Sequence, residues 1–146
     1  MRTKLVKRYW CDFCNKAGLS AGAMAKHEKH CTMNPNRECR VCKMVEAQGH
    51  TLVSLIAMLP DSRPYIDTCS GYDDDNHVQG RFLSEAVAAV LPEFRKQAEN
   101  CPACMMAAFR QAKIPLPMVD GFNFTEEMKS IWADINAAQA HNEGCY

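Results

Sequence analysis

Two cysteines separated by two residues, Cys11 and Cys14, precede a histidine and a cysteine separated by three, His27 and Cys31. Cysteine sulfur and histidine nitrogen are the usual ligands of protein-bound zinc, and four of them complete a tetrahedral site. The first pair fits a tight turn that points both sulfurs at one ion. The second pair lies about one helical turn apart on one face. This spacing predicts a zinc site made by all four residues.

The segment that holds these ligands, residues 9–31, resembles the two-Cys, two-His zinc finger in its variant with a terminal cysteine ligand. Tyr9 stands where that family carries an aromatic residue, and Met24 where it carries a core leucine. The resemblance implies a small ββα module whose helix covers about residues 21–30. It covers about a sixth of the chain and gives no family for the remainder.

Two features of this module leave alternatives open. Gly18 stands where the family carries its central aromatic residue, so we expect Leu19 or Phe13 to fill that space. The fourth ligand is either Cys31 or His30. We favour Cys31, because one helical turn needs three or four residues and His30 lies only three after the first histidine.

Two further Cys-x2-Cys pairs lie outside this module, with 58 residues between them. Each pair stands at or just before the start of a predicted helix, where backbone N–H groups stabilise the thiolate form that binds metal. We therefore predict a second, four-sulfur zinc site made by Cys39, Cys42, Cys101 and Cys104, and two zinc ions per chain. Four ordinary buried cysteines, a redox pair, or His50 in place of one cysteine are the alternatives.

The remaining cysteines and histidines show no ligand spacing. Cys69 and Cys145 are expected to be free thiols, and His77 and His141 have no ligand pattern around them. The acidic run at residues 73–77 is expected to be a solvated loop, with a divalent-cation site as the less favoured alternative.

The composition indicates an intracellular, cytoplasmic protein. Nine cysteines are an odd number, and the basic N-terminus is not followed by the apolar stretch of a signal peptide. No apolar run is long enough to span a bilayer, so no membrane association is expected. In a reducing compartment cysteine pairs bind metal more often than they form disulfides.

The net charge of zero hides an asymmetry. Residues 1–43 hold ten Lys or Arg and three Asp or Glu, a net charge of +7, and residues 44–146 carry −7. A basic module favours phosphate or an acidic protein surface, unless the two parts neutralise each other by packing together. The candidate contact residues for nucleic acid or a partner are Lys4, Lys7, Arg8, Lys16, Lys26 and Lys29.

Sequence-specific DNA reading is not expected of this module. The helix positions that read bases in a zinc finger fall on Ser20, Gly22, Ala23 and Lys26. Small side chains lack the paired donors and acceptors that base recognition needs, and a single finger contacts only about three base pairs.

The chain is predicted to be mainly α, with a zinc-finger module at residues 1–36 and a helical domain at residues 37–146. Asn34-Pro35-Asn36-Arg37 is a turn signal between them. Helices are expected at residues 43–48, 51–59, 81–99 and 102–112, with a loop at residues 60–80 and a last helix beginning near residue 125.

Particular residues are expected to cap these helices, to end them or to form their buried faces. Thr51 and Thr125 are predicted N-caps, and Pro60 is expected to end the helix that Thr51 begins. Pro92 should kink or split the helix at residues 81–99. The last helix is expected to bury Met128, Ile131, Trp132 and Ile135.

The motifs favour binding over catalysis. We find no nucleotide-binding glycine loop, no nucleophile elbow and no His-Glu-x2-His motif. The expected function is a non-catalytic, zinc-binding adaptor or inhibitor that docks on another macromolecule, a protein in the first place. The alternative is a nucleic-acid-binding regulator that uses the basic module for phosphates. The small, cysteine-rich chain also suggests an accessory protein of a phage or mobile element.

Overall fold

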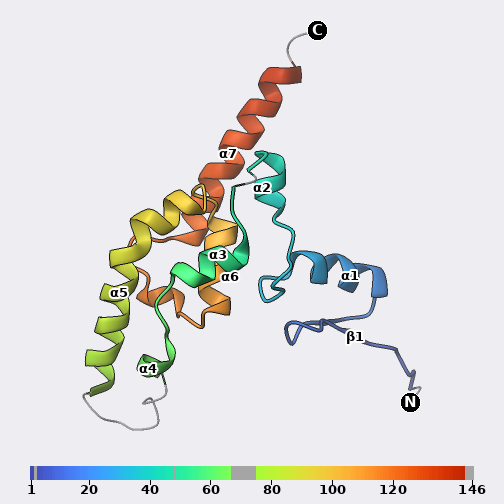
Figure 1. The fold of residues 1–146 in the computed structure, drawn as a ribbon. Coiled ribbons are helices and arrows are strands. Elements are labelled where there is room, and N and C mark those ends of the chain that lie inside the picture. The colour runs from blue at the N-terminus through green and yellow to red at the C-terminus, as the bar shows by residue number, and fades with distance from the viewer. Residues whose placement is uncertain (2, 48, 67–74, 144–146) are drawn as a thin grey trace.

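The computed structural model describes residues 1, 3–47, 49–66 and 75–143, and these residues are mainly α-helical. A small β-hairpin packed on one helix forms the N-terminal module, and the helices that follow form a second, larger part (Figure 1). The predicted fold class, a ββα-like module followed by a helical part, is confirmed.

The N-terminal module consists of strands β1 (Tyr9–Trp10) and β2 (Ala17–Gly18) and helix α1 (Ala21–His30). The strands are antiparallel, with Tyr9 opposite Gly18 and Trp10 opposite Ala17. Ser20 caps α1, because its hydroxyl accepts a hydrogen bond from the Ala23 N–H at 3.3 Å. The helix therefore begins where the resemblance to zinc fingers placed it.

Met24 fills the small core of the module, as its place at the family's core leucine position predicted, and it also fills the space at Gly18. Met24, Cys11 and Cys31 are its buried residues. Leu19 and Phe13 stay 66% and 40% exposed, so the prediction that one of them fills the space at Gly18 is wrong. A Cβ at Gly18 would lie 3.3 Å from the Met24 Cε, which shows that the flexible methionine already occupies that space.

The helical part is built around helix α6. Its elements are α2 (Arg40–Met44), α3 (Leu52–Met58), α4 (Arg63–Ile66), α5 (Asp75–Gln97), α6 (Pro102–Gln111), the 3-10 helix η1 (Leu116–Met118) and α7 (Phe124–Glu143). Helix α6 is buried over most of its length and packs on both α3 and α7. The C-terminal end of α7 projects away from the other helices (Figure 1).

Several predicted helix boundaries change in the structure. The helix expected at residues 43–48 is α2, which begins at Arg40. The loop expected at residues 60–80 contains α4 and the start of α5, and Pro92 lies inside α5 without splitting it. Proline at this position removes one N–H donor, and the flanking turns continue the helix.

Of the two predicted N-caps, the structure confirms one and replaces the other. Thr51 caps α3 as predicted, in a reciprocal pair of hydrogen bonds with Ser54. Thr125 does not cap α7. The helix begins one residue earlier, and the Asn123 Oδ1 accepts from the Glu126 N–H at 3.2 Å. Asparagine is as good a cap as threonine, so the local sequence does not decide between them.

One aromatic cluster forms the centre of the helical part. Phe94 and Phe109 are fully buried, with ring centroids 5.1 Å apart, and Phe122 packs against Phe109 at 5.3 Å. Nearby, the Arg95 guanidinium forms a half-buried ion pair with Glu127 at 2.7 Å and also donates to the Gly121 carbonyl. This ion pair joins α5 to α7, and the Glu127 carboxylate raises the pKa of Arg95.

The stripe predicted for α7 is only partly buried. Ile135 is buried, and Met128 and Ile131 are half-buried. Trp132 is 38% exposed, so its predicted burial is wrong. Its place beside a surface groove is described below.

The N-terminal module is fastened to the helical part by polar contacts. The Gln111 Nε2 donates to the Thr32 and Asn34 carbonyls at 2.8 and 3.1 Å. Arg110 donates to the Thr32 hydroxyl, and Arg37 donates to the Ala103 carbonyl at 3.2 Å. The Gln111 bonds satisfy two carbonyls of the turn between the two parts, and all four bonds fix the module beside α6.

Within the residues given above, no helix is both long enough and apolar enough to cross a membrane.

Phe109→Ala should lower the free energy of unfolding by about 3–5 kcal/mol, because it empties a fully buried site between two other rings. Phe82→Ala removes the same atoms from a side chain that is 54% exposed and is the matched control. Denaturant unfolding of the two purified variants measures both losses. Equal losses for the two variants would contradict the placement of the core.

Candidate metal centres

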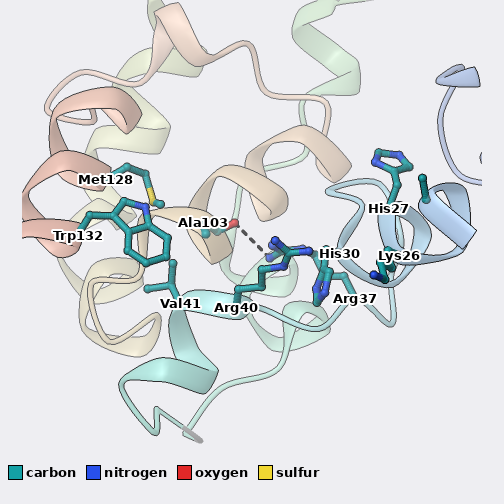
Figure 2. A pocket seen from close by; sticks show the side chains of 10 residues that line it. Lys26, His27, His30, Arg37, Arg40, Val41, Ala103, Met128 and Trp132 are labelled. Carbon is teal, nitrogen blue, oxygen red and sulfur yellow. Dashed lines mark hydrogen bonds between the residues drawn. The ribbon is translucent and has the colours of Figure 1, made fainter. Parts of the chain in front are cut away.

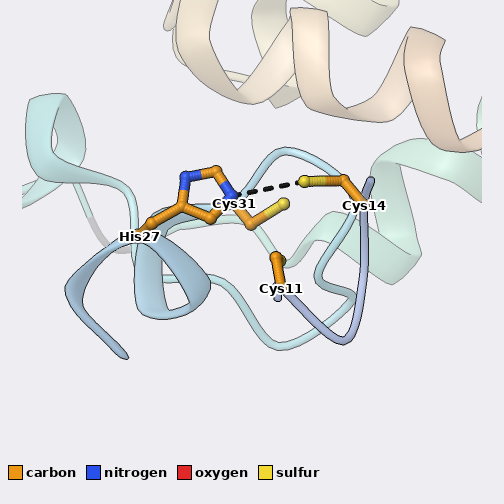
Figure 3. A group of neighbouring side chains, drawn as sticks. All are labelled: Cys11, Cys14, His27 and Cys31. Carbon is orange, nitrogen blue, oxygen red and sulfur yellow. Dashed lines mark hydrogen bonds between the residues drawn. The ribbon is translucent and has the colours of Figure 1, made fainter. Parts of the chain in front are cut away.

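Four side chains of the N-terminal module converge on one point (Figure 3). Cys11 and Cys14 come from the turn between β1 and β2, whereas His27 and Cys31 come from the end of α1. Their ligand atoms all lie within 4.8 Å of one another, and the Cys14 Sγ lies 3.3 Å from the His27 Nε2. The group could hold a metal ion.

Local hydrogen bonds shape the turn that carries the two cysteines. The Cys11 N–H donates to the Lys16 carbonyl at 2.9 Å, and the Phe13 N–H points at the Cys11 sulfur at 3.5 Å. The Glu28 carboxylate on α1 accepts from the Asp12 N–H at 3.0 Å. The turn is therefore held against the helix that supplies the other two side chains.

Cys31, and not His30, lies in this group. Helix α1 ends at His30, and Cys31 adopts an extended conformation (φ −58°, ψ 132°) in the buried core of the module. The His30 Nδ1 instead donates to the Glu38 carbonyl at 2.9 Å. The histidine ring is thus tied to the segment that follows the module.

The pKa values of two thiols in this group shift in opposite directions. The hydrogen bond with His27 lowers the pKa of Cys14 to about 7. Burial raises the pKa of Cys31, because the thiolate loses its hydration. A bound cation would replace the proton on the buried sulfur and remove that penalty.

The second group joins two helices that are far apart in the sequence. Cys39 and Cys101 are the N-cap residues of α2 and α6, and Cys42 and Cys104 lie in the first turns of these helices. The Cys39 and Cys101 sulfurs are 3.6 Å apart, and the Cys42 and Cys104 sulfurs are 3.4 Å apart. All four sulfurs lie within 4.8 Å of one another, so this group could also hold a metal ion.

The separations of the ligand atoms fit a tetrahedral ion. A zinc ion with Zn–S bonds of about 2.3 Å places its sulfurs about 3.8 Å apart, and a sulfur and an imidazole nitrogen about 3.5 Å apart. The observed sulfur–sulfur distances of 3.6 and 3.4 Å are slightly shorter than this and much longer than a disulfide bond of about 2.05 Å. Both donor sets, sulfur with or without imidazole, are consistent with zinc.

The four sulfurs of the second group perturb one another strongly. Hydrogen bonding from Cys101 lowers the pKa of Cys39, and hydrogen bonding from Cys104 lowers that of Cys101. The pKa values of Cys42 and Cys104 are raised, chiefly by their hydrogen bonds with Cys101. Four thiols crowded in a largely buried site cannot all ionise without a cation, and a metal ion supplies that positive charge.

Three residues outside the ligand set surround this group. The Arg37 Nη1 lies 3.9 Å from the Cys104 sulfur, and the His50 Nε2 lies 3.7 Å from the Cys42 sulfur. The other ring nitrogen of His50, Nδ1, lies 3.6 Å from a Glu99 carboxylate oxygen. The alternative in which His50 replaces a cysteine therefore does not fit, because four sulfurs already converge. His50 and Arg37 are placed to orient the sulfurs and offset their charge.

Sequence reasoning did not identify Arg37 or Glu99 as neighbours of the metal group. Glu99 is 49 residues away from His50, and its carboxylate also accepts from the Gly49 N–H at 2.8 Å. No spacing rule connects residues that meet only because two helices pack side by side, so the sequence held no signal for them.

The predicted contact residues have different surroundings. All six are exposed: Lys4, Lys7, Arg8, Lys16, Lys26 and Lys29. The Lys29 ammonium pairs with the Glu38 carboxylate at 3.0 Å, and the Lys7 ammonium lies over the Tyr9 ring at 5.4 Å from its centroid. Lys26 lines a groove between the two parts of the chain.

Some predicted features cannot be placed. Cys69 and Cys145 lie outside the described residues, as do the side chains of the acidic run at 73–77, which includes His77, and that of His141.

Comparison of this chain with family models, with curated proteins and with solved structures gave no match. No family is therefore identified for the N-terminal module, and the finding is a Cys-Cys-His-Cys group on a β-hairpin and a helix. The functional argument accordingly rests on the geometry of this chain alone.

Cys31→Ala should remove the metal from the N-terminal group, whereas His30→Ala should retain it, because only Cys31 lies among the other donors. Native mass spectrometry of the two purified variants counts the bound ions directly. Loss of one ion from His30→Ala, with full occupancy in Cys31→Ala, would show that the histidine is the fourth ligand.

Proposed function

We propose that the chain binds two zinc ions and acts as a non-catalytic adaptor or inhibitor that docks on another protein. The observation that carries the proposal is that both donor groups are complete, with four protein ligands each. A catalytic zinc keeps an open position for water or substrate, whereas a structural zinc is enclosed by four protein ligands. Both ions then serve to hold the fold, and the activity lies in the surface that they hold.

The N-terminal module offers an apolar surface of the kind that binds proteins. Trp10 on β1 and Leu19 directly after β2 are 60% and 66% exposed, and Phe13 is 40% exposed in the turn between the strands. Leu5 and Val6, in the segment before β1, are also exposed. Large apolar side chains gathered on one small module favour protein docking.

A second candidate function is weak binding of nucleic acid. It is favoured by the exposed cations at Lys4, Arg8 and Lys16, which can neutralise phosphates. Base reading is not supported. The Ser20 hydroxyl is engaged in capping α1, and Ala23 and Lys26 face a groove shared with α6 and α7. That face of the helix is not free to enter a DNA major groove.

The purified protein should contain two zinc ions, and Cys101→Ser should lose one of them and much of its stability. The variant opens the tie between α2 and α6, so we expect its melting temperature to fall by about 10 °C. Elemental analysis and thermal unfolding measure the two effects. Cys69→Ser, which lies in neither predicted ligand set, is the matched control.

A melting curve of Cys101→Ser that matches the parent would show that the four sulfurs do not act as a unit. Fewer than two zinc ions in the parent protein, purified without chelator, would contradict the proposal that both groups are structural zinc sites.

Binding to a random DNA duplex should be weak and lost as salt is raised. If four cations contact phosphates, the logarithm of the binding constant falls with a slope of about −3.6 against the logarithm of salt. Lys4→Glu with Lys16→Glu should abolish this binding, and the control pair Lys96→Glu with Lys129→Glu, on the helical part, should not. Much tighter binding of one defined sequence at physiological salt would contradict the adaptor proposal.

A further inference from the structure

A groove of about 520 Å³ lies between the N-terminal module and the helical part. Its walls come from α1, the segment before α2, α2 itself, α6 and α7. Figure 2 shows basic side chains along one side and the side chains of Met128 and Trp132 on the other. We call it the basic groove and define it by Lys26, His30, Arg37, Arg40, Met128 and Trp132.

The charge of the basic groove is of one sign. Lys26, Arg37 and Arg40 contribute three cations, and no carboxylate is found among the described residues that line it. Glu38, in the segment before α2, lies outside the lining and pairs with Lys29. The Arg37 charge also faces the Cys104 sulfur, whereas Lys26 and Arg40 form no ion pair among the described residues. Positive charge in a concave site attracts an anion more strongly than the same charge on a flat surface.

Arg37 has hydrogen-bonding capacity left for such an anion. Its Nη1 donates to the Ala103 carbonyl and lies near the Cys104 sulfur. Its Nε is buried and has no hydrogen-bond partner. The edge of the guanidinium formed by Nε and Nη2 is the edge that binds a carboxylate with two parallel hydrogen bonds, and the Nη1 contacts leave it free. The unpartnered Nε shows that the guanidinium keeps hydrogen-bonding capacity that the contacts within the chain do not use.

The opposite wall is apolar. Trp132 is 38% exposed and Met128 is half-buried, and both project from α7 towards the groove (Figure 2). An exposed tryptophan beside a flexible methionine offers a surface on which an aliphatic or aromatic side chain can pack. The groove therefore combines an anion site with an apolar contact site.

We propose that the basic groove binds an acidic segment of the partner protein, in which carboxylates flank an aliphatic or aromatic side chain. The carboxylates contact Arg37, Arg40 and Lys26, and the apolar side chain packs on Trp132 and Met128. The inference deepens the proposed function by naming the chemistry of the partner, and it rests on that function.

A protein segment fits the groove better than nucleic acid does. A DNA duplex receives a convex helix or strand pair into its own groove, and a hollow of this size does not accept a duplex. A single strand could stack a base on Trp132 and place phosphates on the arginines. Met128 beside the indole favours an aliphatic contact over a base. Binding of single-stranded DNA is therefore measured as the competing outcome in the experiment below.

The test uses the zinc-loaded full chain with the substitution Trp10→Phe. The sequence holds two tryptophans, so Trp132 is then the sole source of tryptophan emission. The probe is a short synthetic peptide of glutamates around a central pair of leucines. We expect a saturable blue shift of the Trp132 emission as the leucines cover the indole. Peptides with serine for leucine, or with glutamine for glutamate, should bind at least about tenfold more weakly, a loss of about 1.4 kcal/mol.

Variants locate the binding on the chain. Arg40→Glu, at the first position of α2 where a carboxylate suits the helix, should also weaken the peptide about tenfold or more. The matched control Lys96→Glu reverses one charge on α5, away from the groove, and should bind like the parent. For Trp132→Ala, anisotropy of a labelled peptide replaces the lost emission signal, and weaker binding is expected.

Three results would overturn the inference: no saturable binding, equal weakening by Arg40→Glu and Lys96→Glu, or tighter binding of an oligothymidine of the same charge. The zinc content of every variant is measured in parallel. If the Arg40→Glu variant keeps both zinc ions and still docks on the partner protein, the groove proposal is refuted and the adaptor proposal is not. Absence of zinc would refute the proposed function itself.

Discussion

Cys39 and Cys101 are 62 residues apart in the chain, and their sulfurs lie 3.6 Å apart at the starts of two helices. A cross-link that closes a loop of this length removes about 4 kcal/mol of conformational entropy from the unfolded chain. One of the two tied helices, α6, is the most buried element of the helical part. A metal ion bound by the four sulfurs would therefore hold the short helix α2, which buries only Val41 and Cys42, against the centre of the fold.

The position of the N-terminal module depends on the same region. Arg37 bonds to the Ala103 carbonyl, lies beside the Cys104 sulfur, and also lines the basic groove. Asn34, buried in the turn before it, donates to the Glu28 carbonyl of α1 and accepts from the Asn36 N–H. One short segment thus links the metal group, the turn and the groove. A disturbance of the metal group would be transmitted to the groove through Arg37.

Local sequence signals predicted much of this structure, because they report on neighbours along the chain. The cysteine pairs, the bounds of α1 and the capping threonine at Thr51 depend on residues three or four apart. Longer-range features were missed for a physical reason. The exposure of Trp132 depends on what packs beside α7, and the space at Gly18 is filled by Met24 from another element. His50 meets Glu99 only after α3 and α6 are in place.

The opposite charges of the two halves of the sequence raised the alternative that they neutralise each other by packing together. The contacts between the N-terminal module and the helical part do not support it. Arg37, Arg110 and Gln111 donate to carbonyl or hydroxyl oxygens there, and not to carboxylates. Among the described side chains, Lys29–Glu38 is the ion pair within residues 1–43, and none joins these residues to 44–146. The positive charge of the module therefore supports the proposal that its partner is acidic.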